Sequence, residues 1–303
     1  MRDIIPIQKY GKSYALLSEA NRVETAIVFV HGLGGKPTET WLDFQTLVDS
    51  TPEDSNFWSE SDLFFYSYDS TKTPVRRNAQ ILGEFVVEAW YGELHRKSRL
   101  VIRLRDEPIT THRYRHLILV GHSLGGVLIR RLILDEFERL KRNLEDSNPD
   151  LSSEGLRKRL KSEVDSNYIL NSQIRLFAPA CMGINFSSAP GFLMEFSRFL
   201  QALSATSVVR NELTAGSPIL LTLQAGTEKA HKEFRKLRAL YTRPLFGTAD
   251  TVVYAESYEG EEPIWANSFD HISICKPNSD YALPLTFVHG DKNKILQEQV
   301  FYD

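Results

Sequence analysis

The chain has 303 residues and a formal net charge of −3, so it has no basic surplus with which to bind nucleic acid, and we expect no nucleic-acid partner. Apolar residues make up 42% of the sequence and charged residues 25%, as in ordinary globular proteins. A chain of this length buries enough surface to fold without disulfides or metals, and we predict a single domain over residues 1–303.

The amino-terminal segment does not have the form of a secretory signal. Its first apolar run is interrupted by Pro6, Gln8 and Lys9, before a signal-length hydrophobic core is complete. No stretch of the sequence approaches the ~20 apolar residues that cross a bilayer. We therefore expect a cytoplasmic protein without a transmembrane segment, for which any contact with a membrane surface would be transient.

Short apolar runs alternate with longer helical patterns along the chain. Strands are predicted over residues 26–30, 63–68, 117–120, 174–178, 251–254 with the residues just before them, and 263–266. Continuous apolar runs are typical of strands buried on both faces of a sheet. Apolar residues at helical spacing predict helices over 75–91 and 124–144. The alternation predicts an α/β fold, with a mostly parallel sheet flanked by helices.

Two segments depart from this alternation. Residues 141–166 are dominated by charged and polar side chains, and we interpret them as a charged surface insertion. Residues 183–223 carry Phe192, Phe196 and Phe199 at helical spacing, which predicts an apolar helix inserted between late strands. Two interpretations stay open: a cap or lid whose Phe side chains bind an acyl group, or an ordinary helix packed into the core.

The strongest local signal is the hexapeptide GHSLGG at 121–126, between a predicted strand and a predicted helix. It contains G-x-S-x-G in the strand–turn–helix context of a nucleophile elbow. Such a turn strains the serine backbone, and Gly121 and Gly125 leave room for neighbouring backbone. Ser123 is therefore the predicted nucleophile, at the N-terminal end of a helix whose partial positive charge faces a developing oxyanion.

A second glycine-rich segment, HGLGG at 31–35, follows the strand over 26–30. Here the sequence resembles the α/β-hydrolase superfamily, in which such a loop and the residue after the nucleophile each supply one amide to the oxyanion hole. The resemblance assigns these roles to the backbone N–H groups of Leu33 and Leu124. Losing one such donor typically costs about 10²–10³ in rate. We expect His31 to shape the loop.

A nucleophilic serine needs a base, and the base needs an acid to orient it. Three histidines follow Ser123 in the sequence. His231 belongs to a polar helical pattern and His289 to a turn-like segment. His271 lies in a loop just after a late strand, where the superfamily places its catalytic histidine, and it is the predicted base.

The predicted acid is Asp250, a loop residue just before a short apolar run and 21 residues ahead of the histidine (271 − 250). Asp270 is the main alternative because it adjoins His271, and Glu256 is a weaker one. Neighbouring side chains in an extended loop point apart, so we expect Asp270 to support the site only indirectly.

The resemblance extends to one branch of the superfamily. The segment DHISICKP at 270–277, the HGLGG loop followed by Trp41, and the pattern over 212–223 are similar to the lipase-like branch that contains the serine-active-site protein and the GPI inositol-deacylase relatives. This similarity covers about residues 10–280. It implies the fold and the triad more specifically than it implies a substrate.

Together these features predict a serine esterase of the carboxylic-ester hydrolase class that works through an acyl-enzyme. The Phe-rich segment favours a lipid or other apolar acyl ester. A thioesterase or peptidase with the same triad stays open, as does a non-catalytic or effector signalling module on the same fold. No metal-ligand spacing is present, so we expect no metal or cofactor. Cys181 and Cys275 are expected to be buried free thiols.

Overall fold

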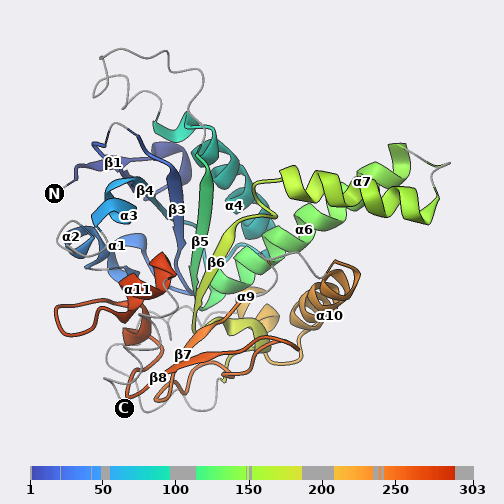
Figure 1. Cartoon of the computed structure of the whole chain (residues 1–303). Coiled ribbons are helices and arrows are strands. Elements are labelled where there is room, and N and C mark those ends of the chain that lie inside the picture. Colours follow the sequence, from blue (N-terminus) through green and yellow to red (C-terminus); the bar gives the residue numbers. More distant parts are fainter. Residues whose placement is uncertain are drawn as a thin grey trace.

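The structure, a computed structural model, describes residues 2–20, 22–41, 43–48, 55–95, 114–147, 149, 152–185, 208–234, 239 and 242–290. Its centre is one twisted sheet with the strand order β1-β2-β4-β3-β5-β6-β7-β8 (Figure 1). The strands are β1 (Ile4–Pro6), β2 (Tyr14–Leu16), β3 (Thr25–Val30), β4 (Ser61–Tyr66), β5 (His116–His122), β6 (Gln173–Phe177), β7 (Leu245–Gly247) and β8 (Ile264–Ala266).

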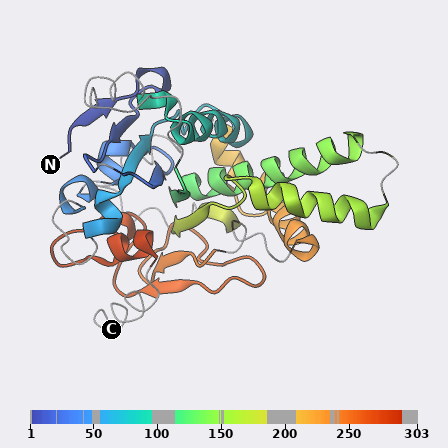
Figure 2. The ribbon, with the colours of Figure 1, turned by 45° about the horizontal axis from the view of Figure 1, so that its top comes forward.

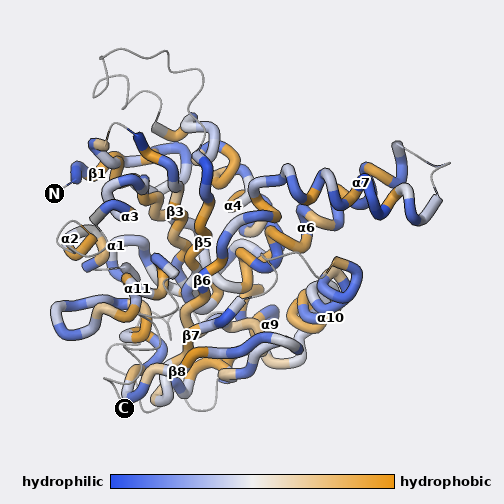
Figure 3. Tube along the Cα trace, viewed as in Figure 1, coloured by the Kyte–Doolittle hydropathy of each residue, from blue (hydrophilic) through white to orange (hydrophobic). Residues whose placement is uncertain are grey.

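From β4 to β8 every strand pair in this sheet is parallel, while β1 and β2 add an antiparallel edge. All residues of β3 and all but the first of β5 are buried, because helices cover both faces of the sheet. The predicted mostly parallel sheet is confirmed. Figure 3 shows the central strands as mainly hydrophobic.

Helices flank the sheet on both sides (Figures 1 and 2). They are α1 (Pro37–Thr40), α2 (Phe44–Leu47), α3 (Ser55–Ser59), α4 (Val75–Trp90), α6 (Leu124–Ser147), α7 (Ser153–Ser166), α9 (Val208–Glu212), α10 (Pro218–Glu233) and α11 (Leu283–His289). Four short 3-10 turns are also described: η1 (Gln8–Tyr10), η2 (Glu93–His95), η4 (Ala180–Met182) and η7 (Ser273–Cys275). The predicted helices over 75–91 and 124–144 correspond to α4 and to most of α6.

Aromatic contacts fix the helices to the two faces of the sheet. Phe29 in β3 stacks on its register partner Phe65 in β4, and it also contacts Trp41 and Phe44 of the α1–α2 segment. The next residue of β4, Tyr66, points to the other face and packs against Phe85 of α4. The alternation of side chains along β4 therefore assigns α1–α2 and α4 to opposite faces.

One predicted strand is wrong. Residues 251–254 form no strand, and within them only Val253 makes an isolated bridge, to Ile184. The physical reason is local: the Asp250 carboxylate accepts the N–H groups of Val252 and Val253 at 2.8 and 3.3 Å, which holds these residues in a turn. The strand that precedes Asp250 is β7, which ends at Gly247.

The charged segment 141–166 takes the form of a helical hairpin that projects from the body of the molecule (Figure 2). α6 continues to Ser147, and α7 returns beside it with Leu160 and Val164 as its buried residues. The remaining side chains of α7 are exposed or half-buried. No helix among the described residues is both long and apolar enough to cross a membrane.

The helix expected around Phe192, Phe196 and Phe199 lies outside the described residues. The two described ends of the 183–223 segment are held close to each other: the Ile184 N–H donates to the Leu213 carbonyl at 2.9 Å. The Asn185 N–H donates to the Val252 carbonyl at 2.7 Å, so the last described residue before position 186 lies beside the turn that carries Asp250.

A buried ion pair ties α6 to the chain between β7 and β8. Arg130 of α6 donates from Nη2 to both carboxylate oxygens of Glu261, at 2.7 and 2.8 Å, and to Thr242 Oγ1 at 3.0 Å. Its guanidinium also stacks over the ring of Tyr258 at 4.3 Å. Both charged side chains are about as buried as the apolar core, at 2% exposure each.

We predict that Glu261→Ala lowers the free energy of unfolding by about 3–5 kcal/mol, because it leaves the Arg130 charge buried without its counter-ion. Urea-induced unfolding measures the effect. Glu259→Ala is the matched control. The Glu259 carboxylate forms an ion pair with Lys232, with 3.5 Å between Oε2 and Nζ, and both side chains are largely exposed. That control is expected to cost less than about 1 kcal/mol. Equal losses in the two variants would contradict the prediction.

Candidate active site

Ser123 lies in the sharp turn between β5 and α6, in the predicted strand–turn–helix context. Its φ is +53°, a left-handed conformation that is costly for a residue with a side chain. The turn is held by its own backbone: the Ser123 N–H donates to the Phe177 carbonyl at 3.0 Å. The Ser123 carbonyl accepts the N–H groups of Gly126 and Ala180 at 3.0 and 3.2 Å.

Two glycines permit this turn to pack against the loop after β3. A Cβ atom on Gly125 would lie 2.2 Å from the Val30 carbonyl oxygen, and one on Gly32 would lie 2.8 Å from the Ser123 Cβ. Both separations are shorter than non-bonded atoms tolerate. The 31–35 loop and the Ser123 turn therefore touch backbone to backbone.

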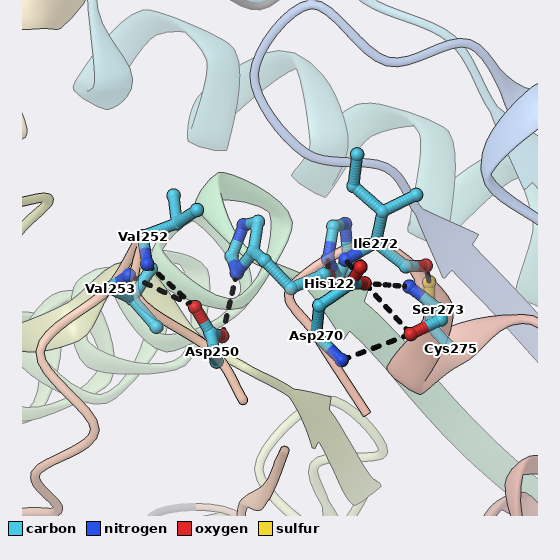
Figure 4. Close-up of polar contacts among 9 residues, drawn as sticks. His122, Asp250, Val252, Val253, Asp270, Ile272, Ser273 and Cys275 are labelled. Atoms are coloured by element: carbon cyan, nitrogen blue, oxygen red, sulfur yellow. Dashed lines mark hydrogen bonds and ion pairs between the residues drawn. The ribbon is translucent and has the colours of Figure 1, made fainter. Parts of the chain in front are cut away.

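The structure joins His271 to Asp250. The Nδ1 atom of His271 is 2.9 Å from Asp250 Oδ2, and both side chains are buried (Figure 4). An ionised carboxylate only accepts hydrogen bonds, so Nδ1 carries the proton and the Nε2 of a neutral imidazole is an acceptor. Neither His271 Nε2 nor Ser123 Oγ has a partner among the described residues, although both atoms are buried.

The Asp250 carboxylate is kept ionised by its neighbours. Burial by itself raises the pKa of this carboxyl, but His271 and the N–H groups of Val252 and Val253 outweigh burial and hold the pKa below its usual value. The same two amides that prevent a strand at 251–254 thus stabilise the charge that faces His271.

Asp270, the main alternative acid, has a different role. Its Oδ1 accepts the N–H of Ile272 at 2.9 Å and both the N–H and the hydroxyl of Ser273 at 2.7 Å (Figure 4). These bonds form a side-chain turn just before η7 and shape the loop that carries His271. Glu256, the weaker alternative, is exposed. Of the three carboxylates, Asp250 is the one bonded to the imidazole.

Two backbone donors have no acceptor near Ser123. Leu124 is the first residue of α6, so its N–H has no acceptor within the helix. The N–H of Leu33 has no acceptor among the described residues, and both residues are buried. These are the amides that the resemblance to α/β-hydrolases assigned to an oxyanion hole.

Side chains after β4, which the sequence analysis missed, brace the loop that carries Leu33. The Tyr68 hydroxyl donates to the His31 carbonyl at 2.7 Å, and the Gly34 N–H donates to Ser70 Oγ at 2.9 Å. The His31 ring bonds the Gly32 carbonyl through Nδ1 at 2.8 Å, so His31 shapes the loop as expected. Because the loops after two neighbouring parallel strands lie at the same edge of the sheet, the polar residues just after β4 could have been proposed from the sequence as contacts of the loop after β3.

A second missed residue is His122, inside the elbow motif itself. Its side chain is buried, and its Nε2 lies 2.7 Å from the backbone carbonyl oxygen of His271. Burial and the neighbouring His271 lower the pKa of His122 to about 3, and burial lowers the pKa of His31 to about 4. Both imidazoles are neutral at physiological pH.

The remaining histidines and the cysteines lie in other settings. His231 is part of α10, and His289 ends α11, where its ring packs on Phe57 rather than lying in a turn-like segment. Cys181 and Cys275 are buried free thiols, as predicted. Burial raises their pKa values to about 11 and about 12. Among the described residues, no cluster of His, Cys, Asp or Glu is placed to hold a metal ion.

The parallel sheet with its antiparallel edge and the serine turn after β5 define the class of protein: this chain has the α/β-hydrolase fold. Among solved structures it matches phospholipase PlaB from Legionella pneumophila with a TM-score of 0.51 and 13% identity. That match covers 92% of this chain and 62% of the phospholipase.

By sequence, the particular proteins that this chain is similar to are SERAC1 proteins. SERAC1 of Danio rerio is 25% identical over 305 residues, which cover 89% of this chain and 39% of the relative. SERAC1 of Bos taurus is 22% identical over 330 residues, which cover 98% and 44%. This chain thus spans about two fifths of the length of these curated relatives. No family model matches the sequence.

We predict that stability falls as the pH drops below about 6.5, because the unfolded chain then protonates His31 and His122 while the folded chain does not. Each histidine contributes about 1.4 kcal/mol per pH unit over the range between its two pKa values. Urea titrations between about pH 7 and pH 5 measure how the free energy of unfolding depends on pH. In His122→Gln the slope of that dependence should be smaller by about the contribution of one histidine. His116→Gln, at the exposed start of β5, is the control, and an unchanged slope in His122→Gln would contradict the prediction.

Proposed function

We propose that this chain is a serine hydrolase of the esterase type, with Ser123 as nucleophile, His271 as general base and Asp250 as orienting acid. The observation that carries the proposal is the pair of buried, unpartnered atoms, Ser123 Oγ and His271 Nε2, on a histidine whose Nδ1 is bonded to a buried carboxylate. Buried polar atoms in folded proteins normally have partners. What sets these two apart from the other unpaired buried atoms of the described residues is their setting: the oxygen lies in a strained strand–helix turn, and the nitrogen belongs to a ring whose other nitrogen is bonded to a carboxylate.

In the proposed reaction, Ser123 Oγ attacks the carbonyl carbon of the substrate and passes its proton to His271 Nε2. The carbonyl oxygen becomes an oxyanion, which the N–H groups of Leu33 and Leu124 stabilise. His271 then gives the proton to the leaving oxygen, and an acyl-enzyme on Ser123 remains. Water, deprotonated by His271, attacks the acyl-enzyme and releases the acid and the free serine.

Asp250 contributes orientation and charge. By accepting the Nδ1 proton of His271, it leaves Nε2 as the basic atom and stabilises the imidazolium that forms during attack. Its lowered pKa means that it carries its negative charge throughout the working pH range. The bonds from Val252 and Val253 prevent the carboxylate from turning away from the ring.

For the substrate we propose a carboxylic ester with an apolar acyl group, as in lipids. The support is the sequence pattern of Phe192, Phe196 and Phe199, together with the attachment of the 183–223 segment beside the turn of Asp250. The same triad also serves thioesterases and peptidases. A panel of esters of graded chain length, matched thioesters and peptides discriminates among these classes.

The proposal predicts that a fluorophosphonate probe labels the chain at Ser123 alone. The strained turn leaves this hydroxyl without a hydrogen-bond partner, and in the proposed mechanism His271 activates it as a base. Mass spectrometry of the labelled peptide makes the assignment. Ser123→Ala should abolish labelling and ester hydrolysis, and Ser162→Ala, on the exposed face of α7, should retain both. An unlabelled wild-type chain would favour the non-catalytic signalling module instead.

A further prediction separates the two adjacent carboxylates. Asp250→Asn keeps an oxygen for the Val252 and Val253 amides but presents an N–H to His271, so the imidazole is driven to the wrong tautomer. We expect kcat to fall on the order of 10⁴-fold, as in a comparable triad. Asp270→Asn keeps the oxygen that accepts the N–H groups of Ile272 and Ser273, and it should change kcat by less than about 10-fold. Steady-state ester hydrolysis measures both, and the reverse ranking would make Asp270 the acid.

A further inference from the structure

The residue that precedes Ser123 contacts the backbone of the proposed base. His122 ends β5, and His271 follows it by 149 residues in the sequence. The distance from His122 Nε2 to the His271 carbonyl oxygen is 2.7 Å, a short hydrogen bond between two buried groups (Figure 4). This bond connects the elbow directly to the loop after β8.

The direction of the bond follows from the chemistry of its two ends. A carbonyl oxygen only accepts, so the proton must lie on Nε2 of His122. Burial and the nearby His271 keep the pKa of His122 at about 3, so the ring is neutral and carries this single proton. His122 is therefore a fixed donor to the His271 carbonyl at any pH where the protein is folded and active.

The His122 ring is held in place by its surroundings. The rings of His271 and Trp41 lie 4.8 and 6.4 Å away between centroids. On the Nδ1 side, the chain passes so close that a Cβ on Gly32 would lie 3.1 Å from the nitrogen. His122 thus contacts both the loop that carries Leu33 and the loop that carries His271.

The residues on either side of the His271 carbonyl are held separately. Asp270 forms a side-chain turn just before η7, and the Cys275 thiol lies 3.6 Å from the carbonyl oxygens of Thr40 and Ile272. The peptide plane that contains the His271 carbonyl is held at both edges: its N–H, from Ile272, donates to Asp270 Oδ1 at 2.9 Å, and its carbonyl oxygen lies 2.7 Å from His122 Nε2. A rotation of that plane would displace the backbone that carries the imidazole. The bond from His122 restrains that rotation.

We propose that His122 is a positioning residue: its Nε2–H bond to the His271 carbonyl sets the orientation of the catalytic imidazole toward Ser123. The inference rests on the proposed function, and it adds to it a requirement for a donor at the position before the nucleophile. His122 does not touch the substrate or move a proton in the reaction.

The test compares His122→Gln with His122→Asn. The amide nitrogen of Gln is as many bonds from Cβ as Nε2 of His, so it reaches the same carbonyl, whereas that of Asn is one bond short. We expect His122→Asn to lower kcat about 10–100-fold with KM changed less than about 3-fold, since small misplacements of reacting groups cost that much. His122→Gln should stay within about 3-fold of the wild type.

Thermal unfolding of both variants serves as the stability control, because both bury an amide in place of the ring. Equal kcat losses in the two variants would overturn the proposal, since the ring and not the donor would then matter. Wild-type kcat in His122→Asn would overturn it as well. A KM effect without a kcat effect would also count against it, because the imidazole acts in the chemical step.

A second readout needs no catalysis. The proton between His271 Nδ1 and Asp250 gives a low-field proton NMR signal, assigned by its loss in Asp250→Asn. We expect His122→Gln to keep this signal and His122→Asn to shift or lose it. The chain could hydrolyse no ester while the signal is kept in His122→Gln and shifted or lost in His122→Asn. In that case the proposed function fails and the positioning role stands. A signal that is absent in the wild type, or identical in all three proteins, would overturn the positioning role.

Discussion

The constraint on which the rest of the structure depends is the left-handed backbone of Ser123. Such a conformation costs about 1–3 kcal/mol and persists only when the surroundings enforce it. Here the enforcement comes from β6 and η4, whose Phe177 and Ala180 bond the backbone of Ser123, and from the close approach of the β3 loop over Gly125. The same turn that strains Ser123 begins α6, so the Leu124 N–H has no hydrogen-bond partner within the helix.

The parallel sheet supplies the remaining parts of the site. Since the carboxyl ends of parallel strands meet at one edge, the loops after β3, β5, β7 and β8 converge there, and with them Leu33, Ser123, Asp250 and His271. Each loop is then held by its own short-range bonds. Tyr68 and Ser70 brace the first, the amides after Asp250 fix its carboxylate, and Asp270 shapes the turn after His271.

Several buried side chains of this region pair with their neighbours, whereas Ser123 Oγ and His271 Nε2, like His31 Nε2 and Trp41 Nε1, have no partner among the described residues. Asp250, Asp270 and His122 each bond neighbours. A neutral His122 joins the two halves of the site without adding a positive charge that would compete with His271 for Asp250. The same burial that makes His122 a permanent donor makes it a source of acid instability, so both properties have one cause.

Short-range patterns in the sequence by themselves determined the elbow at 121–126, the buried strands β3, β5 and β6, and the choice of His271 by its place after a late strand, because each depends on neighbours along the chain. The sequence favoured Asp250 as the acid and left Asp270 open, and the tertiary structure shows that the carboxylate bonded to the imidazole is that of Asp250, since which side chain faces the ring depends on how two loops meet. Tertiary structure also replaced the expected strand over 251–254 with a turn around the Asp250 carboxylate. The bond from His122 to His271 was equally invisible to the sequence, because nothing local reveals a contact between residues 149 positions apart.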